Sequence, residues 1–288
     1  MSAFVENRTF LKAVKVTLPV QRVEWIPDAV NNECCEPLMV CGSNDSETWK
    51  KDTTSAWIKL FSSSDSAVIK LYKGSVLATT QPTPILFPKD NGFSLYGSVN
   101  WTDVMNVDGI GCYSIKIDYT IGGVTDTLVW GGYQLWEFSS KIVDQTFRIK
   151  SIFNSFHDIE NINFTNAKVI DTIRLSGYFG DMQPNTVFDN IIYPDKTMKK
   201  VKRENLRKYF LFTNPLKYVY INLLVNLHLL SEDEIYLSDF NGVNPSLSYL
   251  DYPLIVSESP ELEYSDGAKK VSLKCTFTDK IENNKTHY

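Results

Sequence analysis

Apolar and polar positions alternate in short runs over most of this chain, and turns separate the runs. The clearest alternation covers Cys112–Tyr119, stops at the Gly-Gly pair 122–123 and is answered by Thr127–Trp130. A period of two places one face of a strand in the core and the other in water. Many such runs at short spacing predict a mainly β fold.

The region before residue 140 predicts a β-sandwich of the immunoglobulin or jelly-roll kind. One hairpin is indicated by Ala67–Tyr72, a glycine turn at 73–75 and Val76–Ala78. The region after it predicts longer strands, so we divide the chain into a sandwich-like domain at 1–140 and a β-rich domain at 141–288. Further strands are expected at 10–16, 23–26, 56–61, 93–96, 146–153, 170–175, 187–193, 209–212, 234–239, 253–257 and 271–277.

One helix is expected in the second domain, near residues 215–230. Asn214 can cap it, and Pro215 suits its first position. Apolar residues at helical spacing then dominate as far as Leu230, so we expect the helix to be buried or to lie against another subunit. From this helix and the strand after it, the candidate interface residues are Tyr218, Tyr220, Leu224 and Tyr236.

Composition and charge narrow the classes of function. The chain has 16 Phe, 15 Tyr and 6 Trp, which favours sheets and protein interfaces. The net charge of −5 argues against a protein that binds nucleic acid over its whole surface. However, the segment Asp195–Lys208 holds seven basic and two acidic residues. It is either a solvated hairpin or a basic strand that faces DNA or an acidic partner, through Lys199, Lys200, Lys202 and Arg203.

The chemistry of an active site is not apparent. The chain has only three histidines, and none has a partner at metal-ligand spacing. The spacing of Cys34, Cys35 and Cys41 does not fit a zinc site, and free thiols are expected. We therefore predict no catalytic residues, no metal and no cofactor, and a protein that is not an enzyme. A secretory signal and a membrane-spanning run are not apparent either, so no membrane partner is expected.

A series of segments in the second half resembles a known group of proteins. The segments are Ile173–Gly180, Tyr209–Thr213 after the basic strand, Asp233–Asp239 and Phe277–Lys280. In this order they resemble virion structural proteins of tailed bacteriophages that infect Bacteroidota, crAss-like phages in particular. The similarity runs from about Trp101 to the C-terminus.

The resemblance implies a structural subunit of the virion, assembled in the cytoplasm of the host bacterium. Such a subunit is expected in a neck ring or collar, or in the tail, as a homo-oligomeric ring around the DNA channel. Its partners would be the portal and the adjacent ring or tail proteins, and a non-specific contact with DNA is left open. The resemblance supplies no catalytic residues.

Two alternatives remain at this stage. The first is a β module of a tail fibre that binds carbohydrate or a host receptor, with Trp101, Trp130 and Trp136 as candidates for stacking on sugars. The second is a glycan-degrading enzyme, because a glycosidase needs only two carboxylates that are distant in sequence.

Overall fold

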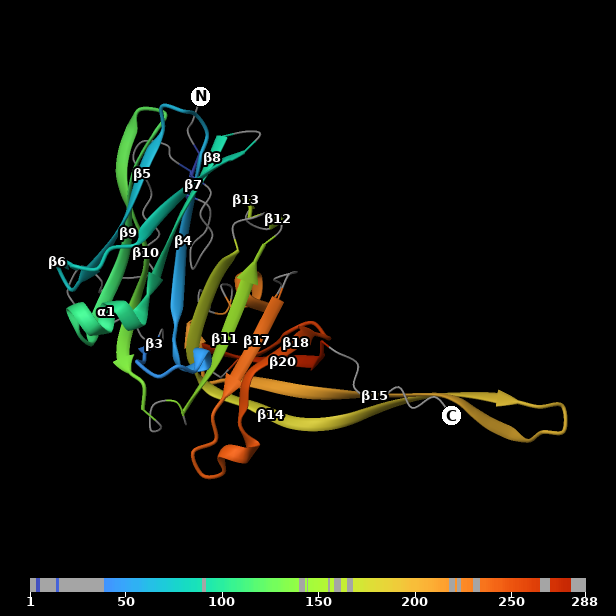
Figure 1. The fold of residues 1–288 in the computed structure, drawn as a ribbon. Helices are drawn as coiled ribbons and strands as arrows, with labels where there is room; N and C mark the ends of the chain where they lie inside the picture. Colours follow the sequence, from blue (N-terminus) through green and yellow to red (C-terminus); the bar gives the residue numbers. More distant parts are fainter. Residues whose placement is uncertain are drawn as a thin grey trace.

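The computed structural model is mainly β, with one α-helix among the described residues (Figure 1). The description covers residues 4–5, 14–15, 39–89, 92–139, 143, 145–154, 156–157, 162–164, 168–217, 221, 224–229, 234–264 and 270–280.

Six antiparallel strands of the second half close into a barrel, because the last strand of the series pairs back with the first. In order around the barrel they are β11 (Thr146–Phe153), β17 (Glu234–Asp239), β18 (Tyr249–Val256), β20 (Lys270–Asp279), β15 (Met198–Thr213) and β14 (Val169–Ile192). Two short strands, β16 (Leu216–Lys217) and β19 (Glu261–Tyr264), add to β20. Closure leaves the barrel wall without a free edge.

The first half joins the barrel through β3 (Met39–Gly42), which meets β14 at Met39 opposite Arg174. From β3 the sheet continues through β10 (Val124–Glu137), β9 (Gly111–Ile121), β5 (Ser66–Lys73) and β6 (Val76–Leu77). A separate sheet consists of β4 (Thr53–Leu60), β8 (Gly92–Asn100) and β7 (Thr83–Lys89). The remaining paired strands are β1 (Phe4–Val5) with β2 (Val14–Lys15), and β12 (Phe156–His157) with β13 (Ile162–Asn163).

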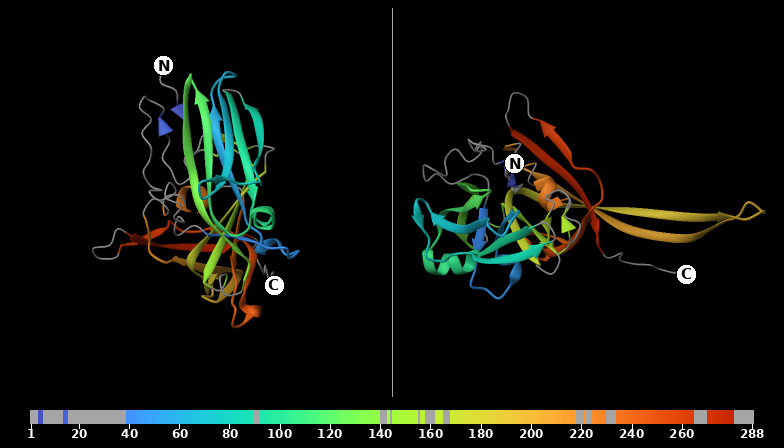
Figure 2. Two further views of the ribbon diagram at one scale, coloured as in Figure 1. Left: turned by 90° about the vertical axis from the view of Figure 1, so that its left-hand side faces the viewer. Right: turned by 90° about the horizontal axis from the view of Figure 1, so that it is seen from above.

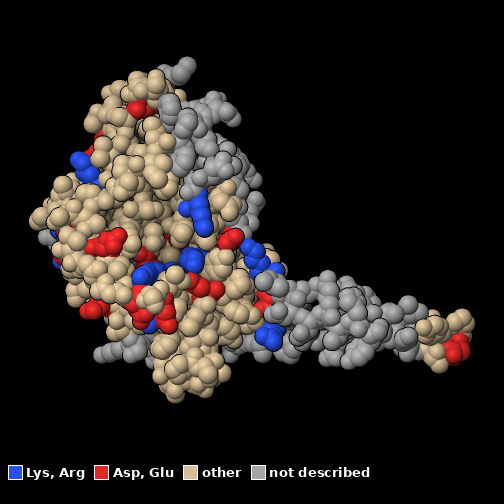
Figure 3. Space-filling model, viewed as in Figure 1, with Lys and Arg blue, Asp and Glu red and all other residues tan. Residues whose placement is uncertain are grey.

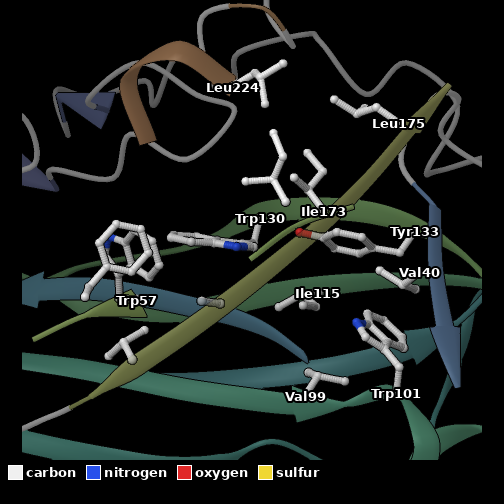
Figure 4. Packing of buried hydrophobic residues seen from close by; sticks show 14 of the residues in the cluster. Val40, Trp57, Val99, Trp101, Ile115, Trp130, Tyr133, Ile173, Leu175 and Leu224 are labelled. Carbon is white, nitrogen blue, oxygen red and sulfur yellow. The ribbon is translucent and has the colours of Figure 1, made fainter. Parts of the chain in front are cut away.

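A single hydrophobic cluster extends through both halves (Figure 4). The Trp57 ring lies 4.9 Å from that of Trp130 and 5.3 Å from that of Phe164, each in an edge-on arrangement. Ile173 and Leu175 carry the cluster onto β14 of the barrel. Burial of these large side chains is the main force that holds the two halves together.

The helix α1 (Trp101–Asp108) follows β8 directly and was not predicted. The side chain of Asn100 caps it by accepting a hydrogen bond from the Thr102 N–H. Gly109, with a φ of 79°, ends it. Trp101, Thr102 and Val104 face the core, so the helix covers one end of the first half.

The two hairpins predicted most clearly are confirmed. β5 and β6 pair around Gly74, and β9 and β10 pair around Gly122 and Gly123. All three glycines have a positive φ, of 58°, 58° and 80°, which explains why glycine occupies these turns. The strand predicted at 23–26 lies outside the described residues.

The helix predicted near 215–230 is wrong at its start. Leu216 and Lys217 form β16, which pairs with Val271 and Lys270 of β20. The backbone N–H of Asn214 donates to the Ser176 carbonyl instead of starting a helix. Sheet pairing therefore overrides the apolar spacing at the start of the segment. Further along, residues 224–229 form a π-helical turn, η2 (Leu224–Leu229).

The sandwich of immunoglobulin or jelly-roll type is not confirmed, whereas the mainly β class is. The division of the chain at residue 140 stays a prediction. The thiols of Cys41 and Cys275 are free, as expected, and both are buried. Cys112 is disulfide-bonded, which contradicts the expectation of a free thiol at that position.

Candidate functional site

A cluster of buried charges lies where the first half meets the barrel. Asp52, in the loop before β4, has no accessible surface. Its Oδ1 accepts a hydrogen bond of 2.7 Å from Nε of Arg148, and its Oδ2 accepts one of 2.6 Å from Nε of Arg174. Both arginines point from barrel strands and are almost fully buried. A carboxylate in this position is tolerated because both of its oxygens are paired.

Asp251 on β18 extends the cluster toward the surface. Its Oδ1 accepts from Nη1 of Arg148 at 2.6 Å, and its Oδ2 accepts from Nζ of Lys150 at 2.9 Å. Burial alone would raise the pKa of Asp251, but the positive charges of Arg148 and Lys150 hold it below its ordinary value. The carboxylate is therefore charged at neutral pH and stabilises the cations beside it.

Backbone groups complete the cluster and fix the chain around it. The Cys41 N–H donates to Oδ2 of Asp52 at 2.6 Å. Arg148 donates to the Lys51 carbonyl at 2.8 Å, and Arg174 donates to the Trp49 carbonyl at 3.0 Å. These contacts anchor the segment 41–52 to β11 and β14. The cluster can hold two parts of the fold in register, but substrate cannot reach its buried groups.

A second set of contacts joins β4 to β14 through side chains. The Thr53 N–H donates to Oγ1 of Thr172 at 2.8 Å, and this hydroxyl donates back to the Thr53 carbonyl. The Ser55 N–H donates to Oδ1 of Asp171 at 2.9 Å. Burial raises the pKa of Asp171 to about 8, and a proton is therefore retained near neutral pH.

The most prominent feature of the molecule is a two-stranded projection, which we call the arm and define as residues 181–208. β14 and β15 leave the barrel together, remain paired from Gln183–Lys208 to Ile192–Met198, and extend far beyond the body (Figures 1 and 2). Ten residues of strand at about 3.3 Å each give a length of roughly 33 Å. Apart from Lys208, which pairs with Thr278 of β20, no residue of the arm pairs with a further described strand.

Packed aromatic rings hold the root of the arm. The rings of Phe179 on β14 and Tyr209 on β15 stack at 5.6 Å. Hydroxyl groups of Tyr209 and Tyr252 each donate to Oδ1 of Asp279 at 2.9 Å. Burial, then the hydrogen bonds to Tyr252 and Asp279, raise the pKa of Tyr209, so the phenol remains neutral. The arm therefore starts from a rigid base.

The tip of the arm, Ile192–Thr197, presents apolar side chains. Ile192 is 64% exposed and Tyr193 is 43% exposed. A tight turn closes the tip: the Lys196 N–H donates to the Tyr193 carbonyl at 2.9 Å, and Asp195 accepts from the Thr197 N–H. Exposed apolar groups on a projection are typical of a contact with another protein.

The structure places the predicted basic residues on the arm. Lys199, Lys200, Lys202 and Arg203 all belong to β15, opposite Ile191 to Phe188 of β14. Their backbone is described, and their side chains lie outside the description. On the face seen in Figure 3, basic side chains also lie near the root of the arm.

The four predicted interface residues lie elsewhere. Tyr218 and Tyr220 lie outside the described residues. Leu224 is fully buried in the core. Tyr236 is half-buried, its hydroxyl donates to Glu234 at 2.6 Å, and Nζ of Lys150 lies 4.7 Å from its ring centroid. Their role in an interface stays a prediction.

A second exposed apolar surface was missed by the sequence analysis. We call it the edge patch and define it as Val76, Leu77, Val107 and Ile110, each more than half exposed. Asp108 ties its two segments together, because its carboxylate accepts from the Thr79 N–H at 2.7 Å. The short run Val76–Leu77 on an edge strand was the available signal, but its exposure depends on the tertiary structure.

The tryptophans proposed for sugar stacking are mostly internal. Trp101 is 0% exposed and Trp130 is 1% exposed, so neither offers a ring face to a sugar. Trp136 is 38% exposed. Two of the three candidates therefore serve the core of the fold.

Comparison with models of known protein families gave no match, and a search of curated proteins gave no significant relative. Among the described residues, no three His, Cys, Asp or Glu side chains are grouped as metal ligands would be. No helix in the described part has the length and apolar character needed to span a bilayer.

Proposed function

We propose that this chain is a structural subunit of a tailed-phage virion, and that copies of it form an oligomeric ring in the neck or tail around the DNA channel. The resemblance of Ile173–Gly180, Tyr209–Thr213 and the later segments to such proteins supports this proposal. Its partners would be the portal and the adjacent ring or tail proteins, and it would be assembled in the host cytoplasm.

The arm is the observation that carries the proposal. A two-stranded hairpin alone is only marginally stable in water, and beyond Lys208 both edges of this arm carry backbone groups that no described strand pairs with. The chain nevertheless extends it from a rigid root formed by Phe179 and Tyr209. A projection of this kind is useful when it reaches another subunit.

The charges on the arm fit a place near the channel. Seven of the 28 arm residues are basic and four are acidic, in a chain whose net charge is −5. A positive projection is attracted both to DNA phosphates and to an acidic neighbour. Non-specific contact with DNA in the channel is therefore part of the proposal.

The buried charge cluster is suited to a subunit that must withstand mechanical force in an assembled particle. Asp52 pairs with arginines on two barrel strands, so it resists separation of the two halves.

We also propose that the two sheets of the first half form a sandwich of the immunoglobulin or jelly-roll kind, because strands of both contribute to one core.

Mass spectrometry of purified particles, followed by cryo-electron microscopy of their neck and tail, tests the proposal. We expect the chain in the particles at a fixed number of copies that matches a ring. Its absence from purified particles would refute the proposal. A glycan array separates the tail-fibre alternative, because specific binding to a sugar would favour a receptor-binding module.

A further inference from the structure

We propose that the tip of the arm of one copy docks on the edge patch of the next copy, so that the subunits associate head to tail. This inference rests on the proposed oligomeric function and assigns the two contacting surfaces. Ile192 and Tyr193 are the tip residues that would be buried, and Val76, Leu77, Val107 and Ile110 would receive them.

The positions of the two surfaces support a head-to-tail contact. The arm extends from one side of the molecule, whereas β6 and α1 lie at the opposite end (Figures 1 and 2). A copy cannot bring its own tip to its own patch across the body. When two different surfaces on opposite sides are complementary, the association is heterologous, and it closes into a ring if the rotation between copies permits.

The edge patch has the features of a receiving surface. β6 is the last strand of its sheet, and on its outer side the described residues offer no pairing strand. Val76 is 69% exposed and Val107 is 61% exposed, and the two side chains lie on neighbouring segments, so they form one apolar surface. Apolar contact at the tip and backbone groups at the edge of β6 would act together.

Charge favours a second copy over a neutral partner. The arm, residues 181–208, carries a net charge of +3 from seven basic and four acidic residues. The other 260 residues hold 22 basic and 30 acidic residues, which gives them a net charge of −8. Next to the patch, α1 contributes Asp103 and Asp108, and Lys73 of β5 donates to the Asp108 carbonyl, so these three side chains together carry a net negative charge. The body of one copy therefore attracts the arm of another.

The test uses the full chain and two variants that each damage one surface. The tip variant carries Ile192→Asp, and the patch variant carries Val107→Asp with Ile110→Asp. Val243→Asp is the control, because Val243 is 93% exposed on a different loop. Circular dichroism and thermal unfolding establish that each variant folds. Analytical ultracentrifugation then gives the oligomeric state of each protein and of the mixtures.

We expect the wild-type chain and the control to form oligomers, and each damaged variant to associate at least about 30-fold more weakly. An equimolar mixture of the tip variant and the patch variant should form a dimer and nothing larger. In that dimer, the intact tip of the patch variant binds the intact patch of the tip variant. Either variant alone offers no such contact, because it has only one of the two intact surfaces.

The inference would be overturned by a wild-type chain that stays monomeric, by variants that assemble as the wild type does, or by a mixture without dimers. Assembly that requires added duplex DNA would assign the arm to DNA instead, and also overturns it. Failure of the docking inference is distinguishable from failure of the proposed function. The proposed function is decided by whether the chain is present in purified particles.

Discussion

Nε of Arg174 donates a 2.6 Å hydrogen bond to Oδ2 of Asp52, and neither side chain has more than 1% of its surface exposed. Two charges can be buried in this way only while each retains its partner. The pair links the loop before β4 to the barrel wall, so the stability of the whole fold depends on it.

The first prediction removes this charge. Asp52→Ala leaves Arg174 buried without its carboxylate partner and leaves Arg148 with Asp251 alone, and it should lower the free energy of unfolding by about 3–5 kcal/mol. Urea unfolding followed by tryptophan fluorescence measures the change. The control is Asp118→Asn, whose partner Lys70 lies at the surface, and this variant should lose much less. Equal losses in the two variants would show that burial of Asp52 does not matter.

The second prediction concerns pH. Burial raises the pKa of Asp171 from 3.8 to about 8. Between these values the folded chain holds a proton that the unfolded chain releases, so the free energy of unfolding falls as pH rises from about 4 to about 8. The contribution is up to about 1.4 kcal/mol per pH unit. Urea unfolding at pH 5, 6, 7 and 8 measures the slope.

Asp171→Asn is the control for that slope. The amide retains an acceptor for the Ser55 N–H and does not titrate. We expect the free energy of unfolding of the variant not to fall between pH 5 and 8. Relative to the wild type, the variant should therefore become more stable toward pH 8. A slope that is the same in both proteins would exclude Asp171 as its source.

The third prediction tests the aromatic core. Trp57 contacts Trp130, Phe153 and Phe164, and Trp57→Ala should cost about 3–5 kcal/mol through the cavity it leaves. Trp57→Phe should cost less, because the phenyl ring leaves a smaller cavity, while both changes remove an indole N–H that has no hydrogen-bond partner among the described residues. Thermal and urea unfolding measure both. A larger loss for phenylalanine than for alanine would contradict this account.

The fourth prediction compares two glycines of β14 near the root of the arm. Gly177 has a φ of 149°, and a Cβ added there would lie 2.1 Å from the Phe212 carbonyl oxygen. Gly177→Ala should therefore be strongly destabilising. Gly180 has no atom within 4 Å of an added Cβ, and Gly180→Ala should change stability by less than about 0.5 kcal/mol. Similar melting temperatures for the two variants would contradict the steric argument.

The fifth prediction neutralises the arm. Replacing Lys199, Lys200, Lys202 and Arg203 with Gln should weaken assembly or DNA retention and reduce the dependence of either on salt. Sedimentation at several salt concentrations measures assembly, and packaged DNA measures retention. A variant that removes four charges from the body is the matched control, with Gln at Lys59, Lys116, Lys168 and Lys280. Unchanged particles from the arm variant would reject a role for these charges.

Local pattern predicted much of the secondary structure. Period-two alternation located the strands at 112–119 and 234–239, and glycine at 74 and 122–123 located the turns, because these signals depend on neighbours in sequence. The cap at Asn100 was an available signal for α1 that was overlooked, because the helix follows a strand without a loop.

Long-range pairing was not predictable in the same way. β14 was expected as two strands, at 170–175 and 187–193. Between them lie Gly177, Gly180 and Pro184, residue types that normally interrupt a strand. The barrel closes through β11 and β14, and alternation indicates which face is buried but not which strand is the partner. Likewise, no residue near Asp52 in the sequence indicates its role, since Arg148 and Arg174 are about a hundred residues away or more.

The arm and the barrel wall are parts of the same two strands, since β14 and β15 run through both without a loop between them. The arm is thus a rod whose base is part of the barrel wall. A force on the tip would therefore act on β11 and on the loop that holds Asp52 through the barrel wall itself, because both contact β14. Binding at the tip of the arm would in this way affect the entire subunit. A ring of such subunits would become stiffer as each further subunit is added.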